Sequence, residues 1–337
     1  MYGRESTITP KGVIHLEQLL KQALRESYEL NMDQVKAVTN EMFSCSSGHK
    51  RYFVRVTNYK TIVEQQAEVD WTVWLHDKGL AAPEVLFSKR DRSIESITYK
   101  DKEIRIVVYR AAPGEHAKKN QWNKETFERL GEEIGRIHTM SKLYQGNTRA
   151  INDWHMNDEY NWRKYIPKVE KRVRETMESI FRDLEAVPKT NDTYGLVHGD
   201  VWLENVLVEK NKLTLIDYQD CEKHFLLFDL VVPVYSAMEY SFHGNGSIVA
   251  YVHELTKAIF QGYARECWLP PTYLDHLLLM FRLKEVADYL LMHIYGHEVR
   301  GEEEERLFNL YRIKIEQNHL QYLITKELIE ELKTLVV

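Results

Sequence analysis

The sequence predicts an α+β protein built as two lobes, a small β-rich N-terminal lobe and a mostly helical C-terminal lobe. Its 337 residues exceed what one hydrophobic core usually serves, so two units are the first expectation. Strand-like patterns are concentrated in roughly the first 110 residues, whereas helical periodicity dominates after Gly114. The predicted division is therefore residues 1–110 and residues 111–337.

The first lobe alternates between the two kinds of periodicity. Apolar side chains at helical spacing predict amphipathic helices, and short apolar runs between turn residues predict strands. In chain order, the predicted elements are a helix over 12–30, strands over 34–45 and 51–56 joined by the turn SSGHK, a helix over 63–78, and strands over 82–88 and 103–115.

The second lobe is predicted to be helical apart from one hairpin. The hairpin consists of NVLVE (205–209) and LTLID (213–217), joined at KNK. The helical segments are 126–144, 159–187 with an interruption near Pro167, and everything from Leu226 onward, with breaks at HGNG (243–246) and at the prolines 270–271.

Composition excludes several classes of function. The formal net charge of −6 leaves no basic surface of the kind that nucleic-acid binding requires. Three scattered cysteines, Cys45, Cys221 and Cys267, favour neither a disulfide framework nor a zinc cluster and fit a reducing compartment. No apolar run approaches the ~18 residues of a membrane span, and the N-terminus does not resemble a signal peptide. We therefore expect a cytoplasmic protein without nucleic-acid or membrane partners.

One stretch concentrates the candidate chemistry: LVHGDVWLENVLVEKNKLTLIDYQD, residues 196–220. Carboxylates inside such apolar runs require a charged partner, because an unpaired buried charge costs several kcal/mol. Phosphoryl transfer needs a carboxylate to position the attacking hydroxyl and oxygen ligands for a metal. Asp200 can supply the first, and Asn205 and Asp217 the second. Oxygen ligands without a nearby cysteine favour Mg²⁺ over zinc.

The segments HGDVWLEN and LIDYQD resemble the aminoglycoside phosphotransferase/choline kinase-like superfamily. Further blocks of the chain match that family in the same order: YFVRV, EVDWTVWLHDKGLAAPEV, IVVYRAAPGE, GEEIGRIHTM and LFDLVVPVY. The resemblance implies a bilobal protein-kinase-like fold, with the nucleotide bound by residues 1–110 and catalysis and the substrate in residues 111–337. It also implies a kinase that uses ATP and Mg²⁺.

The resemblance assigns roles within the central stretch. Asp200 would be the catalytic base, and His198 would be a structural or orienting residue of the same loop. Asn205 and Asp217 would hold Mg²⁺.

The resemblance also assigns residues to the nucleotide. The hinge backbone of Arg110 and Ala112 would meet adenine, and Glu68 would pair with a cation on the preceding strand. Family members commonly carry lysine on that strand, whereas this sequence has Arg55, and Lys60 is an alternative cation.

The expected nucleotide loop also departs from the family pattern. Between residues 39 and 50 the only glycine is Gly48, so side chains of Asn40, Ser44 and Ser46 are the candidate phosphate donors. A weaker affinity for ATP, or use of another nucleotide such as GTP, remains open.

Other residues have less certain roles. Asp220 is either a third acidic group at the site or a cap of the following loop, and Asp229 is expected to brace the catalytic loop. The aromatic residues of 152–165 line either a cationic or sugar pocket or the core: Trp154, Tyr160, Trp162 and Tyr165.

The function predicted from these residues is transfer of the γ-phosphate of ATP to a hydroxyl of a small molecule. An amine-bearing alcohol or sugar is favoured, because the surface is slightly acidic and residues 152–165 are rich in aromatic and acidic side chains. A Ser/Thr protein kinase of the same fold and a nucleotide-binding pseudokinase are the alternatives. Phe228 comes only eleven positions after Asp217, and this short interval favours a small acceptor over a protein.

Overall fold

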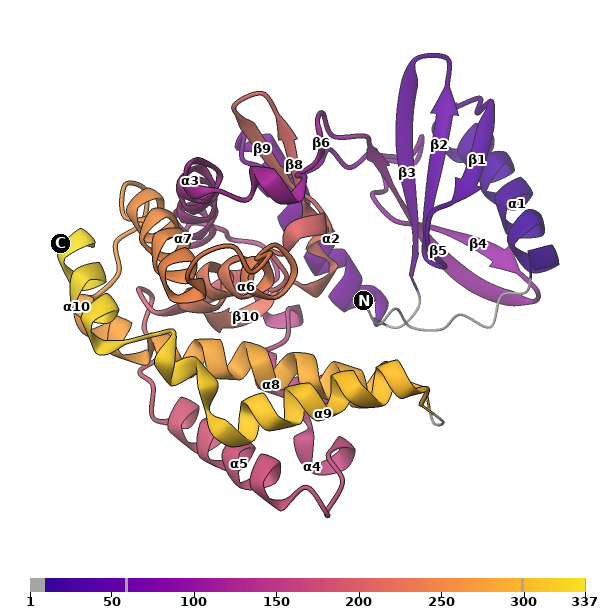
Figure 1. The fold of residues 1–337 in the computed structure, drawn as a ribbon. Helices are drawn as coiled ribbons and strands as arrows, with labels where there is room; N and C mark the ends of the chain where they lie inside the picture. The colour runs from indigo at the N-terminus through magenta and orange to yellow at the C-terminus, as the bar shows by residue number, and fades with distance from the viewer. Residues whose placement is uncertain (1–9, 58–59, 298–299, 337) are drawn as a thin grey trace.

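The computed structural model describes residues 10–57, 60–297 and 300–336, and it confirms the two-lobe α+β architecture (Figure 1). The N-terminal lobe contains a five-stranded antiparallel sheet in the order β1-β2-β3-β5-β4. Its strands are β1 (Gln34–Ala37), β2 (Met42–Ser47), β3 (Lys50–Thr57), β4 (Glu95–Tyr99) and β5 (Lys102–Arg110).

Helix α1 (Pro10–Tyr28) covers one face of this sheet. Its apolar residues Leu20 and Leu24 are buried together with Phe43, Val54 and Ile106 from the strands. The predicted amphipathic helix at 12–30 is therefore confirmed, and the lobe has a core of its own.

Two strand predictions in this lobe were wrong in detail. The run 34–45 is two strands, because Thr39 Oγ1 accepts the backbone N–H groups of Glu41 and Met42 and turns the chain back. The segment 82–88 forms only an isolated bridge between Val85 and Tyr109, and the place beside β5 is taken by β4, which the sequence analysis missed.

Helix α2 (Ile62–Asp77) comes between β3 and β4 in the chain and lies between the lobes (Figure 1). A capping box between Thr61 and Glu64 begins it, as the sequence pattern favours. Trp71 and Leu75 are fully buried and belong to the hydrophobic core of the helical lobe, whereas Val69 packs in a small cluster with sheet residues. The core of the second lobe thus includes a helix that precedes residue 110 in the chain.

The C-terminal lobe is helical as predicted. Its helices are α3 (Lys124–Ser141), α4 (Trp162–Tyr165), α5 (Lys171–Glu185), α6 (Leu226–Tyr240), α7 (Ile248–Tyr263), α8 (Leu277–Tyr295), α9 (Glu302–Gln317) and α10 (Lys326–Leu335). Helices α3 and α7 touch at glycines: a Cβ on Gly262 would lie 1.8 Å from the carbonyl oxygen of Glu128.

Two small sheets lie at the inner end of this lobe. The predicted hairpin is present as β8 (Val206–Glu209) and β9 (Lys212–Leu215), and β6 (Glu115–His116) adds a third strand. The second sheet pairs β7 (Tyr194–Val197) with β10 (Glu222–Phe225) and was not predicted. The chain between β7 and β8 is the loop of the HGD motif.

Among the described residues, no helix is both long and apolar enough to span a bilayer. The three cysteines are buried free thiols.

Candidate active site

A cavity of about 1030 Å³ separates the two lobes and is lined by residues of both. Seven of the ten predicted site residues line it: Asn40, Arg55, Arg110, Ala112, Asp200, Asn205 and Asp217. The other three, Ser44, Glu68 and His198, are not among the residues that line this cavity. The structure therefore brings together most of the side chains that the sequence indicated, from segments as far apart in the chain as those of Asn40 and Asp217.

Asp229, at the start of α6, accepts hydrogen bonds from the backbone of the HGD loop, residues 198–200. Its carboxylate accepts the backbone N–H of His198 at 2.7 Å and that of Gly199 at 2.8 Å, and it also contacts His138 Nε2 at 3.1 Å. Burial would raise the pKa of Asp229, but the hydrogen bonds from His138 and the charges nearby lower it. Asp229 therefore braces the loop as an ionised acceptor, in agreement with the expectation.

His198 fixes the loop from within. It is 1% exposed; its Nε2 donates to the carbonyl of Ile216 at 3.0 Å and its Nδ1 accepts the N–H of Asp200 at 3.3 Å. Burial lowers the pKa of His198, so the ring is neutral at physiological pH. This geometry gives His198 a positioning role and no direct contact with the cavity.

Gly199 allows the HGD loop to approach the loop that follows Asp217. It has φ of +85°, and a Cβ there would lie 2.5 Å from the carbonyl oxygen of Asp220. Only glycine meets both conditions without strain. The two loops that carry Asp200 and Asp217 are thereby packed against each other.

Asp200, in the HGD loop, lines the cavity. Asn205 Nδ2 donates both to its carbonyl at 2.9 Å and to its Oδ2 at 3.0 Å, so the amide fixes the carboxylate. Burial raises the pKa of Asp200 to about 6; Lys284 lowers it and Asp217 raises it. A carboxyl with a pKa near 6 is ionised at neutral pH and is a stronger base than an exposed aspartate.

Asp217 begins the short turn η6 (Tyr218–Asp220) in the left-handed conformation, with φ of 66°. Burial raises the pKa of Asp217 to about 7, and the charge of Asp220 adds to this. Its Oδ1 is buried and has no hydrogen-bond partner among the described residues. A buried, unpartnered carboxylate oxygen facing a cavity fits a cation ligand.

The donor set fits a hard divalent cation. The hydrogen bonds made by Asn205 Nδ2 leave its Oδ1 as an oxygen ligand beside Asp217. Within the described residues there is no group of three His, Cys, Asp or Glu side chains that could hold a metal ion by itself. Two protein oxygens completed by phosphate oxygens is the arrangement that Mg²⁺ commonly adopts at nucleotide sites.

The cation of the N-terminal lobe is Arg55. It lies on β3, lines the cavity and donates to Glu68 Oε1 on α2 at 2.5 Å, and both side chains are about 2% exposed. Lys60 contacts the other oxygen of Glu68 at 3.2 Å but does not belong to the cavity lining. Of the two candidate cations, Arg55 lines the cavity and Lys60 does not.

The other residues predicted to bind the nucleotide agree only in part with the structure. The β1–β2 turn, with Thr39 and Asn40, lines the cavity, whereas Ser44 lies within β2 away from it. At the hinge, the backbone N–H groups of Arg110 and Ala111 are already donated, to the carbonyls of Glu84 at 2.9 Å and Arg51 at 3.0 Å. Within the described structure, the backbone N–H of Ala112 is the one in residues 110–112 that remains for a base.

The lining of the cavity also includes charged residues that the sequence analysis missed. They are Glu159, Glu222 and Lys284, and the tyrosines Tyr160 and Tyr295 line the cavity with them. Glu222 and Lys284 could have been found, because a charged residue on the buried side of a strand or helix is an exception that calls for a partner. Lys284 lies on α8 and its ammonium contacts Asp288 at 2.6 Å.

The aromatic residues of 152–165 divide between core and cavity. Trp154 and Trp162 are buried in the core of the helical lobe, and Tyr165 bonds to Asp158. Of this set, only Tyr160 lines the cavity, so the pocket interpretation was wrong for the two tryptophans.

Three comparisons bear on this site. The model of the family described as "Phosphotransferase enzyme family" (APH) matches residues 35–268. Amicoumacin kinase of Bacillus subtilis (strain 168) is 26% identical over 315 residues, which are 91% of this chain and 94% of that protein.

Among solved structures, amicoumacin kinase hAmiN in complex with AMP-PNP, Ca²⁺ and Ami superposes with a TM-score of 0.83 at 22% identity, covering 92% of this chain and 96% of that one. A microcompartment-associated aminopropanol kinase superposes with a TM-score of 0.70 at 18% identity, covering 91% and 97%. These likenesses show the same fold.

Proposed function

Since the chain belongs to the APH phosphotransferase enzyme family, we propose that it transfers the γ-phosphate of ATP, with Mg²⁺, to a hydroxyl of an amine-bearing small molecule of the amicoumacin kind. The observation that carries the transferase part is the convergence of Arg55, Asp200, Asn205 and Asp217 on one cavity. ATP as donor is supported by the AMP-PNP bound in a structure of the same fold.

Each residue has a chemical task in this proposal. Arg55, held by Glu68, binds the phosphates, and Asn205 and Asp217 would hold Mg²⁺, which neutralises charge on the phosphate oxygens when bound. Asp200 accepts the proton of the acceptor hydroxyl. The hydroxyl oxygen forms a bond to the γ-phosphorus while the bond between this phosphorus and the oxygen of ADP breaks.

The amine is inferred from the excess of acidic residues in the cavity lining. Eight carboxylate residues line the whole cavity against four basic ones: Glu41, Glu115, Glu159, Asp200, Glu204, Asp217, Asp220 and Glu222 against Arg51, Arg55, Arg110 and Lys284. Within the part of the chain that the structure describes, Glu222 makes no ion pair, and burial raises its pKa well above the ordinary value. An ammonium group of the acceptor would supply the missing counter-charge.

A small acceptor is favoured over a protein by the chain that follows Asp217. This segment forms η6 and then β10, which pairs with buried β7 and leads directly into α6. No exposed segment of the kind that receives a peptide lies there in the described structure.

The cytoplasmic location is inferred from the buried free thiols.

The test is Mg·ATP consumption with amicoumacin, simple amino alcohols, aminoglycosides and a generic protein as acceptors. We expect turnover with an amine-bearing alcohol. Asp200→Asn should lower kcat by about 10²-fold or more, since the base is lost. Asp192→Asn, at an exposed ion pair with Lys142 away from the cavity, is the matched control and should leave the rate unchanged. Binding of ATP with no turnover of any acceptor by wild type would contradict the proposal and favour a pseudokinase.

A further inference from the structure

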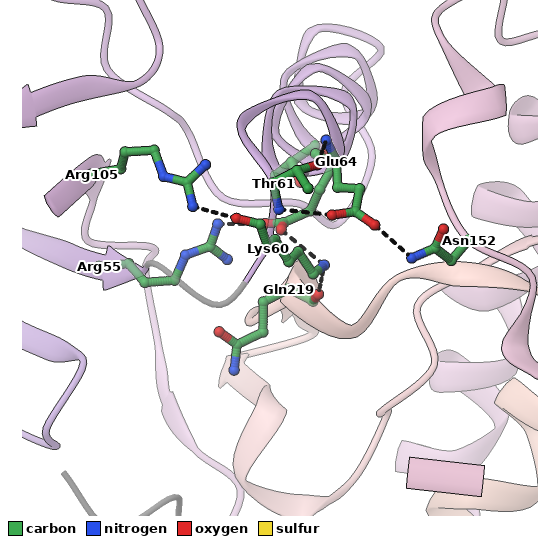
Figure 2. A network of polar contacts seen from close by, with 9 residues as sticks. Arg55, Lys60, Thr61, Glu64, Arg105, Asn152 and Gln219 are labelled. Atoms are coloured by element: carbon green, nitrogen blue, oxygen red, sulfur yellow. Dashed lines mark hydrogen bonds and ion pairs between the residues drawn. The ribbon is translucent and has the colours of Figure 1, made fainter. Parts of the chain in front are cut away.

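The connection between β3 and α2 contains a cation that touches both halves of the site. Lys60 Nζ lies 3.2 Å from Glu68 Oε2, and it also donates to the backbone carbonyl of Gln219 (Figure 2). Glu68 is on α2, whereas Gln219 lies in η6, two residues after Asp217. One ammonium group therefore links the Arg55–Glu68 pair to the loop of the expected metal ligand.

The link is firmly placed. Arg105 on β5 donates to the carbonyl of Lys60, and Thr61 next to it caps α2 (Figure 2). Only 21% of the Lys60 side chain is exposed. Although burial opposes it, the charges of Glu68 and Asp220 raise the pKa of Lys60, so the ammonium stays protonated. A partly buried lysine in this state is held by its carboxylate and carbonyl partners.

A second bond reinforces the same junction. Asn152, from the helical lobe, donates its Nδ2 to Glu64 Oε1 at 2.9 Å, one turn before Glu68 (Figure 2). Asn152 thus joins the start of α2 to the helical lobe by a contact that does not involve the metal loop. Of these two residues, Lys60 contacts the segment next to Asp217, at Gln219, whereas Asn152 contacts Glu64.

We propose that Lys60 is a positioning residue for phosphoryl transfer, one that fixes the loop of Asp217 relative to Glu68 and Arg55. The inference rests on the proposed function. Asp217 is in the left-handed conformation, which is unfavourable for residues other than glycine, so contacts from neighbouring elements stabilise its loop. The bond from Lys60 to the carbonyl of Gln219 supplies support at the turn itself.

A direct phosphate contact by Lys60 is the competing interpretation. Against it, Lys60 is absent from the lining of the cavity, which includes Arg55, Asn205 and Asp217. Its ammonium is on the Oε2 side of Glu68, and Arg55 is on the Oε1 side. Lys60 therefore acts through Glu68 and the Gln219 carbonyl.

The experiment compares Lys60→Met, Lys60→Gln and Lys60→Arg with Lys89→Met, which removes an exposed lysine paired with Glu29 in the N-terminal lobe. Binding of AMP-PNP is measured first without divalent metal. Mn²⁺ is then titrated into each enzyme with saturating AMP-PNP and followed by electron paramagnetic resonance. The kcat with Mg·ATP and the acceptor completes the set, and thermal unfolding checks that each variant is folded.

For Lys60→Met we expect Mn²⁺ to bind about tenfold more weakly, because losing a residue that orients a metal ligand typically costs 10–100-fold in affinity. Metal-free AMP-PNP binding should change by less than about threefold and kcat should fall about tenfold. Lys60→Arg should restore part of the Mn²⁺ affinity, and Lys89→Met should match wild type. If Lys60→Met lowers the unfolding temperature, Lys60→Gln, which keeps a donor without the charge, is expected to show the same loss of Mn²⁺ affinity.

Two outcomes would overturn the inference while leaving the enzyme a kinase. One is an Mn²⁺ affinity of the folded Lys60 variants equal to that of wild type. The other is a loss of metal-free AMP-PNP binding as large as the loss for Mn²⁺, which would make Lys60 a phosphate ligand. If wild type itself binds no AMP-PNP, the proposed function fails and the inference fails with it.

Discussion

Three aspartates around one cavity raise each other's pKa. Burial is the main cause at Asp200, Asp217 and Asp220, and each is raised further by a neighbouring carboxylate: Asp217 acts on Asp200, Asp220 on Asp217, and Asp200 on Asp220. Such a cluster is stable in ionised form only with cations close by. Lys284, Lys60 and Arg55 supply part of this charge, and a bound metal would supply the remainder.

The buried residue His224 makes the stability of the fold depend on pH. His224 on β10 is fully buried, stacks on Phe228 with ring centres 4.1 Å apart, and accepts the N–H of Phe225 at 2.7 Å. Burial lowers the pKa of His224 to about 3. Its ring therefore stays neutral in the folded state at every pH where the protein is expected to work.

From this pKa we predict a loss of stability at low pH. Below about pH 6.5 the unfolded chain binds a proton at this histidine that the folded chain does not, so stability falls as pH decreases from about 6.5 toward 3. The contribution is at most about 1.4 kcal/mol per pH unit. Urea denaturation between pH 7 and 5 should show a shallower pH dependence for His224→Gln than for wild type.

The control for this prediction is His49→Gln, at the exposed turn between β2 and β3. Its pH dependence should equal that of wild type. Identical slopes for His224→Gln and wild type would show that His224 is not the source.

At the scale of elements, the crossing of α3 and α7 depends on glycine. Gly262 on α7 faces the backbone of α3, and a Cβ there would meet the Glu128 carbonyl oxygen at 1.8 Å. In the opposite direction, a Cβ on Gly131 of α3 would lie 2.0 Å from the carbonyl oxygen of Ile259 on α7. The two backbones are therefore in direct contact, and α3 also carries His138, which supports Asp229.

We predict that Gly262→Ala destabilises the protein by about 3 kcal/mol or more, because the helices must separate to admit one methyl group. The measurement is the free energy of unfolding in urea. Gly301→Ala, at the N-cap of α9 where a Cβ would meet no atom of the described residues within 4 Å, is the control and should cost about 1 kcal/mol or less. Equal stabilities of the two variants would contradict the close approach.

Local sequence pattern predicted the long elements and missed the short ones. The helices at α2, α3 and α5 through α10 follow from apolar periodicity, and the hairpin of β8 and β9 follows from two short apolar runs. Strands β7 and β10 were missed because four-residue strands that pair over about 25 residues have no local turn signal. The split of 34–45 depended on the Thr39 side chain, which a strand-forming run conceals.

The site residues that belong to sequence motifs could be predicted. Asp200, Asn205 and Asp217 follow from one contiguous pattern, and Arg55 with Glu68 follows from family order. Glu159, Glu222 and Lys284 belong to three separate segments that only the tertiary fold brings together, so no local pattern marks them as residues of one cavity.

At the scale of the whole molecule, the lobes do not divide cleanly along the chain. Trp71 and Leu75 of α2 belong to the core of the helical lobe, and Tyr218 of that lobe donates its hydroxyl to the Ala81 carbonyl and packs edge-on against Trp71. The division at residue 110 remains a prediction, and these contacts indicate that α2 is energetically part of the second lobe.

Hydrogen exchange tests this directly. We predict that the amides of α2 exchange as slowly as those of α6 and more slowly than those of β1 and β2, because the opening of a helix follows the core in which it is buried. Mass spectrometry of the native protein in D₂O provides the measurement, with α1 as an internal control for the sheet lobe. Exchange of α2 at the rate of β1 and β2 would show that it belongs with the sheet.

This attachment of α2 opposes any movement of the helix away from the second lobe. In an on–off switch of the kind found in regulated kinases, this helix would have to swing outward and expose Trp71 and Leu75. Burial of such a side chain is worth about 1.5–3 kcal/mol, so two of them hold the inactive arrangement to no more than about one molecule in a hundred.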